Sequence, residues 1–181
     1  SPLEANSGLV ARMKDGRFSV GGSTGDDATM SEEVARPFDG LTVIDLSSNI
    51  AGPYASKLFV DAGATCIKIE GRKGDPMRRW TASQQELAKG ESSPLFQYLN
   101  AGKQSIVLDP RDAQDRARIG RLAERADILF EDLGPGALEA RGLSPDAWLD
   151  ANPHLSVVRI SPYGQEGPWA RRAANDFTLQ A

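Results

Sequence analysis

From Pro37 onward, short apolar segments alternate with segments whose apolar residues recur at helical spacing. Short strands that alternate with helices are typical of a parallel β-sheet covered by helices, because parallel strands need a long crossover connection. The pattern therefore predicts an α/β domain. Its expected strands, in chain order, are residues 41–46, 65–70, 105–108, 127–131 and 155–160.

Three helices are expected between these strands, each marked by residues that favour helix ends. Proline fits the first turn because that turn leaves its N–H groups unpaired, and glycine fits the position after the last turn. The expected helices are residues 51–62 with Gly63 as the cap, a helix beginning at Asp109-Pro110, and a helix from Ser144-Pro145 to Asn152-Pro153.

Residues 1–36 differ in composition from the rest of the chain. Two short runs, residues 9–13 and 17–20, flank Lys14-Asp15-Gly16, which is typical of a β-hairpin. Residues 21–27 have the glycine-rich composition of a flexible linker. We therefore expect residues 1–36 to be a tail, a linker or the end of a preceding domain, and residues 37–181 to form the main domain.

Charge and cysteine content exclude several classes of protein. The formal net charge is -4, so the chain lacks the positive surface that a nucleic acid backbone requires. The single cysteine, Cys66, cannot form a disulfide within the chain, which favours a reducing, cytoplasmic location. No stretch reaches the roughly 20 apolar residues needed to cross a bilayer, and the first residues lack the order of a signal peptide. Neither a membrane nor a nucleic acid partner is expected.

The loop after the first expected strand is a candidate ligand site, because open parallel sheets bind ligands at the carboxyl ends of their strands. It leads into Ala51-Gly52-Pro53, where backbone N–H groups could meet an anion or a thioester carbonyl. The alternative is a tight turn between strand and helix. The loop does not match the G-x-G-x-x-G pattern of dinucleotide-binding proteins, which disfavours a nicotinamide enzyme.

Two further loops fall on the same edge of the expected sheet. Gly134-Pro135-Gly136 is a sharp turn into a short helix closed by Gly142, and it is either a ligand loop or an ordinary turn. The loop after the second expected strand carries a basic stretch that either receives phosphate groups or faces solvent. Its basic residues are Arg72, Lys73, Arg78 and Arg79.

His154 is expected to be an exposed loop residue, since no cysteine or carboxylate stands at metal-ligand spacing from it.

The residue strings of the main domain are more specific than its pattern. In chain order they include Pro37-Phe38-Asp39-Gly40-Leu41, Ala51-Gly52-Pro53, Gly74-Asp75-Pro76-Met77-Arg78, Gly134-Pro135-Gly136-Ala137-Leu138 and Ser161-Pro162-Tyr163-Gly164. Together with the blocks between them, these strings closely resemble the opening of the family III CoA-transferases, the CaiB/BaiF family. The resemblance spans residues 37–181.

This resemblance implies a transferase that moves coenzyme A (CoA) between carboxylic acids through an aspartyl-CoA thioester, which is covalent catalysis by a carboxylate. It implies a Rossmann-like domain with a mostly parallel sheet and helices on both faces, in a homodimer whose subunits interlock like chain links. Acyl-CoA and carboxylates would be substrates, with no tightly bound cofactor and no metal. The CoA-binding residues that it implies are Ile50, Ala51, Gly52, Pro53, Arg72, Leu108, Asp132, Leu133, Gly136, Arg141 and Asn175.

Asp176 is the obvious candidate nucleophile near the end of the chain. The resemblance instead places this residue at the start of a helix and assigns the nucleophile to a Gly-Asp turn beyond Ala181. This chain would then hold no catalytic residue, with Asp176 as the runner-up. Asn175 stands where racemase relatives carry a proton-shuttling histidine, which disfavours a 2-methylacyl-CoA racemase or epimerase.

Two departures from the family pattern leave other functions open. Asp132 stands where relatives usually have asparagine, and Ala140-Arg141 stands where they often have arginine followed by an apolar residue. Loss of a phosphate-binding arginine would cost on the order of 1.5–3 kcal/mol unless Arg141 replaces it. The alternatives are a non-catalytic, degenerate half of a tandem CoA-transferase and an unrelated nucleotide-binding Rossmann-like domain.

Overall fold

The computed structural model describes residues 12–14, 17–19 and 35–175, and the chain divides into two units, Ser1–Val34 and Ala35–Ala181. In the first unit, strands β1 (Arg12–Lys14) and β2 (Arg17–Ser19) pair in antiparallel orientation. An antiparallel pair is therefore present where the hairpin was expected, although Lys14, expected in the turn, lies in β1, and residues 9–11 lie outside the described residues. The expectation that residues 1–36 are a tail, a linker or the end of a domain stays a prediction.

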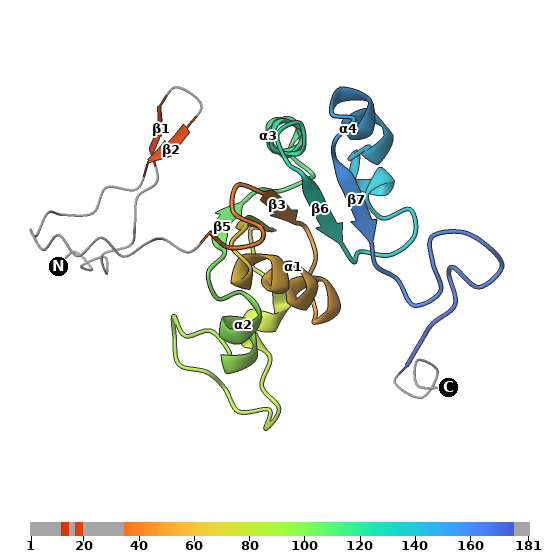
Figure 1. The fold of residues 1–181 in the computed structure, drawn as a ribbon. Helices are drawn as coiled ribbons and strands as arrows, with labels where there is room; N and C mark the ends of the chain where they lie inside the picture. Colours follow the sequence, from red (N-terminus) through yellow and green to blue (C-terminus); the bar gives the residue numbers. More distant parts are fainter. Residues whose placement is uncertain (1–11, 15–16, 20–34, 176–181) are drawn as a thin grey trace, which may run out of the picture. The chain divides into compact units, whose positions relative to one another are not determined.

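The second unit is built on a five-stranded sheet in which every neighbouring pair of strands is parallel (Figure 1). The order is β5-β4-β3-β6-β7, so the chain adds strands on one side of β3 and then continues on its other side. This is the strand order of a Rossmann-like sheet. The predicted strands are all confirmed to within one residue at each end, as β3 (Thr42–Asp45), β4 (Thr65–Glu70), β5 (Gln104–Val107), β6 (Ile128–Glu131) and β7 (Ser156–Arg159).

Helices and short 3-10 helices connect these strands. They are α1 (Ala51–Asp61), η1 (Pro76–Arg79), α2 (Pro94–Leu99), α3 (Ala113–Ala123), η2 (Glu139–Arg141) and α4 (Pro145–Ala151). Residues Ala55 and Phe59 of α1 pack on one face of the sheet, while Ile119 of α3 and Trp148 of α4 pack on the other, so helices cover both faces as predicted (Figure 1). None of the described helices is long and apolar enough to cross a membrane.

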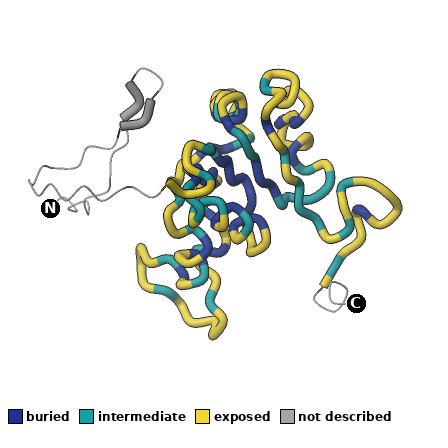
Figure 2. Tube along the Cα trace, viewed as in Figure 1, coloured by how far each residue is buried: buried dark blue, intermediate teal, exposed yellow. Residues whose placement is uncertain are grey.

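The central strands β3 and β6 are buried on both faces, and the edge strands are more open (Figure 2). Val43, Ile44 and Leu129 have no exposed surface, because a helix layer lies on each side of them. Every residue of β5 is exposed, and Val107 keeps 58% of its surface in solvent. The core therefore lies around β3, at the centre of the sheet.

Helix α3 begins later than the sequence pattern predicts. Asp112 caps it, because its carboxylate accepts hydrogen bonds from the N–H groups of Gln114 at 2.8 Å and Asp115 at 3.1 Å. Asp109 instead accepts hydrogen bonds from the backbone and the side chain of Arg111. The prediction of a start at Asp109-Pro110 is therefore wrong, since the aspartate that reaches two free N–H groups makes the better cap.

The other predicted helix ends are confirmed. Gly63 follows the end of α1 with a φ of 113°, which glycine adopts without strain. The Ser144 hydroxyl caps α4 by accepting the N–H of Ala147 at 3.2 Å. The short helix expected after Gly136 is η2, and it closes at Gly142 in the left-handed conformation.

Candidate functional site

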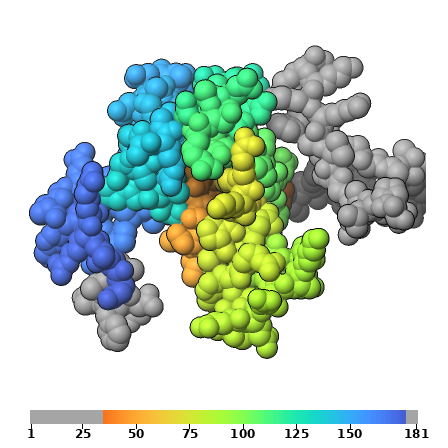
Figure 3. Space-filling view, turned by 180° about the vertical axis from the view of Figure 1, so that it is seen from behind, coloured from red at the N-terminus to blue at the C-terminus, as the bar shows by residue number. Residues whose placement is uncertain are grey.

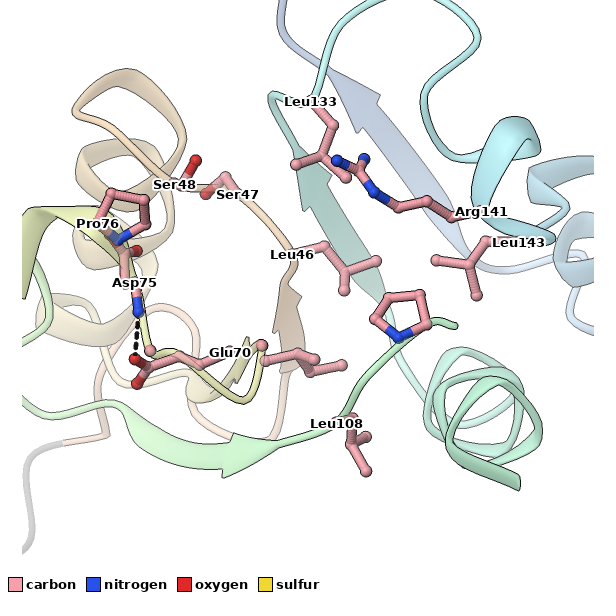
Figure 4. A pocket seen from close by; sticks show the side chains of 14 residues that line it. Leu46, Ser47, Ser48, Glu70, Asp75, Pro76, Leu108, Leu133, Arg141 and Leu143 are labelled. Carbon is pink, nitrogen blue, oxygen red and sulfur yellow. Dashed lines mark hydrogen bonds between the residues drawn. The ribbon is translucent and has the colours of Figure 1, made fainter. Parts of the chain in front are cut away.

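Loops that follow four neighbouring strands converge on one cavity at the carboxyl edge of the sheet (Figure 4). The cavity has a volume of about 230 Å³ and lies at the end of β3, beside the change of strand order where α/β sheets bind ligands. In the space-filling view, the segment after β3 (orange) is recessed between those after β4 (yellow) and β6 (cyan) (Figure 3). The lining residues are Leu46, Ser47, Ser48, Ile69, Glu70, Gly71, Gly74, Asp75, Pro76, Leu108, Pro110, Leu133, Arg141 and Leu143.

The two sides of this cavity differ in chemistry (Figure 4). One side is apolar and is formed mainly by leucines, with the guanidinium of Arg141 extended along it between Leu133 and Leu143. The other side carries hydroxyl and carboxylate groups, from Ser47, Ser48, Glu70 and Asp75. An apolar cavity with one cation and a few polar groups is the usual character of a small-molecule site.

Three of the residues predicted to bind CoA line the cavity: Leu108, Leu133 and Arg141. The other predicted residues do not line it, and their part in binding stays a prediction. They are Ile50, Ala51, Gly52, Pro53, Arg72, Asp132, Gly136 and Asn175. Asp176, the runner-up nucleophile, lies outside the described residues.

The start of α1 fits both interpretations of the loop before it, a tight turn and an anion-binding site. A Cβ atom on Gly52 would collide with the side chain of Ser47, so glycine is needed for the tight turn from β3 into the helix. Ile50, the N-cap residue, makes no side-chain capping bond. The helix start therefore keeps a positive partial charge without a capping side chain, which is the condition for binding an anion.

The basic stretch after β4 divides into residues with different roles. Arg78 turns inward and donates two hydrogen bonds to the Glu70 carboxylate, each at 2.6 Å. Burial alone would raise the pKa of Glu70, but the hydrogen bonds from Arg78 and Ser105 lower it to about 2. The side chain of Arg72 is 65% exposed and lies 3.3 Å from Asp109. Arg78 is therefore part of the fold, and Arg72 faces solvent, where it could meet a ligand.

Beneath the polar side of the cavity lies a cluster of buried charges that the sequence pattern does not predict. The Lys68 Nζ atom lies 2.9 Å from the Asp75 carboxylate and donates to the Ser47 carbonyl oxygen at 2.8 Å. Lys103 pairs with Asp45 at 2.8 Å, and both side chains are almost fully buried. Burial alone would raise the pKa of Asp45, but the two lysine charges lower it. The only sequence signal is that Lys68 interrupts an apolar run, yet this lysine joins the loops after β3 and β4.

Asp132, at the end of β6, contacts the loop that leads into α1. Its Oδ1 atom accepts the N–H of Ser48 at 2.7 Å, which joins the loops after β3 and β6. Its Oδ2 atom faces Gly52, at 3.4 Å from where a Cβ on that glycine would stand. Burial raises the pKa of Asp132 to about 6, although the Ser48 hydrogen bond opposes this shift.

Comparison with models of protein families assigns this chain to a family. The model of CoA-transferase family III matches residues 38–181. The chain belongs to CoA-transferase family III. It is 37% identical over 150 residues to "Probable fatty acyl-CoA transferase Rv3272" of Mycobacterium tuberculosis, and 38% identical over 146 residues to "Acetyl-CoA:oxalate CoA-transferase" of Acetobacter aceti. The resemblance drawn from the residue strings is confirmed, and an unrelated nucleotide-binding domain is excluded.

Solved structures of the family share the fold. A CAIB/BAIF family protein from Brucella suis aligns over 81% of this chain with a TM-score of 0.73 and 35% sequence identity. A structure of the Mycobacterium tuberculosis protein aligns over 78% with a TM-score of 0.69. The chain covers 39% and 38% of these two structures, and 37% and 36% of the two curated relatives. It thus corresponds to little more than a third of each relative.

Proposed function

We propose that this chain supplies the CoA-binding part of an enzyme that moves coenzyme A between carboxylic acids. The observation that carries the proposal is the cavity of about 230 Å³ where the loops after β3, β4, β5 and β6 meet. Ligand cavities of drug-sized molecules measure roughly 300–1,000 Å³, so this one suits a section of CoA. The aspartate that forms the thioester belongs to a region after Ala181, and the complete protein acts as a cytoplasmic homodimer on acyl-CoA and carboxylates.

The chemistry of the cavity supports binding of the nucleotide section of CoA. Its leucine side offers apolar surface for a flat ring, and the Arg141 guanidinium offers a planar set of donors for phosphate oxygens. Arg141 donates to the Ala137 carbonyl oxygen at 3.3 Å, which is a weak restraint on its position. Arg141 therefore takes the phosphate-binding role of the arginine that relatives often have at the position of Ala140.

Calorimetric titration of the chain with CoA tests this proposal. The Arg141→Ala variant should bind CoA about 10- to 100-fold more weakly, because a charge-assisted hydrogen bond to phosphate is lost. Arg125, an exposed residue shortly after the end of α3, provides a matched control, since Arg125→Ala removes the same charge away from the cavity. If the two variants bind CoA equally well, Arg141 is not a ligand of CoA.

Catalysis is tested in a longer protein that includes the region after Ala181. Incubated with acyl-CoA, that protein should form a thioester that hydroxylamine traps, while the 181-residue chain should form none. A thioester on the short chain that disappears in Asp176→Ala would instead make Asp176 the nucleophile. No trappable thioester with any acyl-CoA in the longer protein would contradict a transferase.

A non-catalytic half of a tandem transferase is the second candidate. The observation that favours it is the carboxylate of Asp132 beside the uncapped start of α1, where an anionic ligand would be repelled. The two candidates can be distinguished in the longer protein. Tight CoA binding, together with turnover that is lost in the Asp132→Ala variant, would exclude the non-catalytic half.

A further inference from the structure

We infer that Asp132 makes the binding of CoA depend on a proton, so that the neutral carboxyl admits the ligand and the ionised carboxylate excludes it. The inference rests on the proposed function and adds a residue that determines when the site can accept an anion. It concerns the point where the loop after β6 meets the loop that leads into α1.

The position of Asp132 is the first step. Its Oδ1 atom is bound by the Ser48 N–H at 2.7 Å, and its Oδ2 atom faces the first turn of α1 at Gly52. The adjacent residues Ser48 and Leu133 line the cavity. The carboxylate therefore lies next to residues that line the cavity and beside the start of α1, which an anionic ligand could approach. Two negative charges at this point repel each other.

The charges around Asp132 do not neutralise it. The charged groups that act on it are Asp45 from β3, Lys68 from β4 and Glu131, the last residue of β6. Lys68 is the cation among them, and it already pairs with Asp75 at 2.9 Å. Glu131 pairs with Arg159 at 2.7 Å. Within the described part of the chain, Asp132 forms no ion pair, so no side-chain cation neutralises its carboxylate.

The protonation state of Asp132 changes within a physiologically relevant range, because burial raises the pKa of this carboxyl to about 6. When it is neutral, Oδ1 still accepts the Ser48 N–H, and Oδ2 can carry the proton and donate a hydrogen bond. An asparagine would present the same acceptor and donor at every pH. Asp132→Asn is therefore a close mimic of the neutral state.

The test is calorimetric titration of the 181-residue chain with CoA at about pH 5.5 and about pH 7.5. If only the neutral carboxyl binds, affinity should be about 25-fold weaker at the higher pH, following the fraction of protein that is protonated. Asp132→Asn should bind at the higher pH about as tightly as the unsubstituted chain does at the lower pH. Since a phosphate monoester also titrates near pH 6, the two proteins are compared with the same ligand.

Asp150→Asn is the matched control, because it removes one negative charge from the exposed end of α4. This variant should keep the full pH dependence of the unsubstituted chain. Equal pH dependence in Asp132→Asn and the unsubstituted chain would overturn the inference and leave CoA binding intact. If neither protein binds CoA at either pH, the proposed function fails and the inference fails with it.

A second measurement reports on the carboxyl directly. By linkage, a ligand that prefers the neutral form must raise the pKa of Asp132 when it binds. NMR of the Asp132 carboxyl carbon should therefore show that the midpoint of its titration moves to higher pH when CoA is added. A midpoint that stays in place while CoA binds would contradict the inference.

Discussion

The two faces of the sheet differ most clearly on β3 and β4. The buried side chains that point toward α3 and α4 are apolar, whereas those that point toward α1 change from apolar to charged along the strand. The first set is Ile44, Leu46, Ile67 and Ile69, and the second is Val43, Cys66, Asp45 and Lys68. The charged positions come last, directly beneath the cavity loops. One face therefore contributes mainly core packing, and the other also holds the loops of the site in place.

The largest loss of stability is expected when a buried charge is removed from the face of the sheet that points toward α1. Lys68→Met should lower the free energy of unfolding by about 4 kcal/mol, because it leaves the buried carboxylates of Asp45 and Asp75 with fewer partners. Urea denaturation measures this loss. Lys89→Met, in an exposed loop, should change stability by less than about 0.5 kcal/mol. Equal stability of the two variants would show that the buried cluster adds nothing.

A loss of intermediate size is expected on the apolar face. Leu129→Ala should lower the free energy of unfolding by about 3 kcal/mol, because the side chain is fully buried and its removal leaves a cavity. Leu129 does not line the ligand cavity, so the folded variant should bind CoA as the unsubstituted chain does. A large drop in CoA affinity would mean that the two faces are not separate in function.

The smallest loss is expected from Glu70→Gln, and it should depend on pH. The pKa of Glu70 is lowered to about 2 in the folded chain, so its contribution to stability is complete above its ordinary pKa and disappears as pH falls toward 2. The free energy of unfolding of the variant should therefore be lower by about 2 kcal/mol at neutral pH and nearly unchanged as pH approaches about 2. Thermal melting at several pH values measures this, with the exposed Glu86→Gln as the control. A loss that is the same at every pH would contradict the ion pair with Arg78.

Local sequence patterns predict the strands and the edge of the sheet where the loops form a cavity, because the information lies within a few residues. The apolar run at residues 65–70 becomes β4 with the predicted bounds, and Ser144-Pro145 begins α4. The same kind of signal exists at Ser93-Pro94, where the Ser93 hydroxyl caps α2, but the short helix was not among the expectations. The residue strings identify the family, which local periodicity cannot do.

The buried charge cluster was beyond such prediction, because its partners are far apart in sequence. Lys103 reaches Asp45 across 58 residues, and no local pattern indicates that pairing. The start of α3 was missed for a different reason, since Asp109 and Asp112 both suit a cap and only the backbone geometry decides between them. The ionisation of Asp132 likewise depends on burial by segments remote in the chain.

The strand order also has a consequence for the way the chain is made. Strand β3 is the first strand of its sheet to be synthesised, yet its second neighbour β6 follows much later, as the hydrogen bond from the Thr42 N–H to Asp127 spans 85 residues. Chains fold from the amino end as they leave the ribosome, and unpaired strand edges favour association with other chains. During translation, the strand at the centre of the finished sheet is therefore an open edge, and the nascent chain is most exposed to aggregation until residue 131 has emerged.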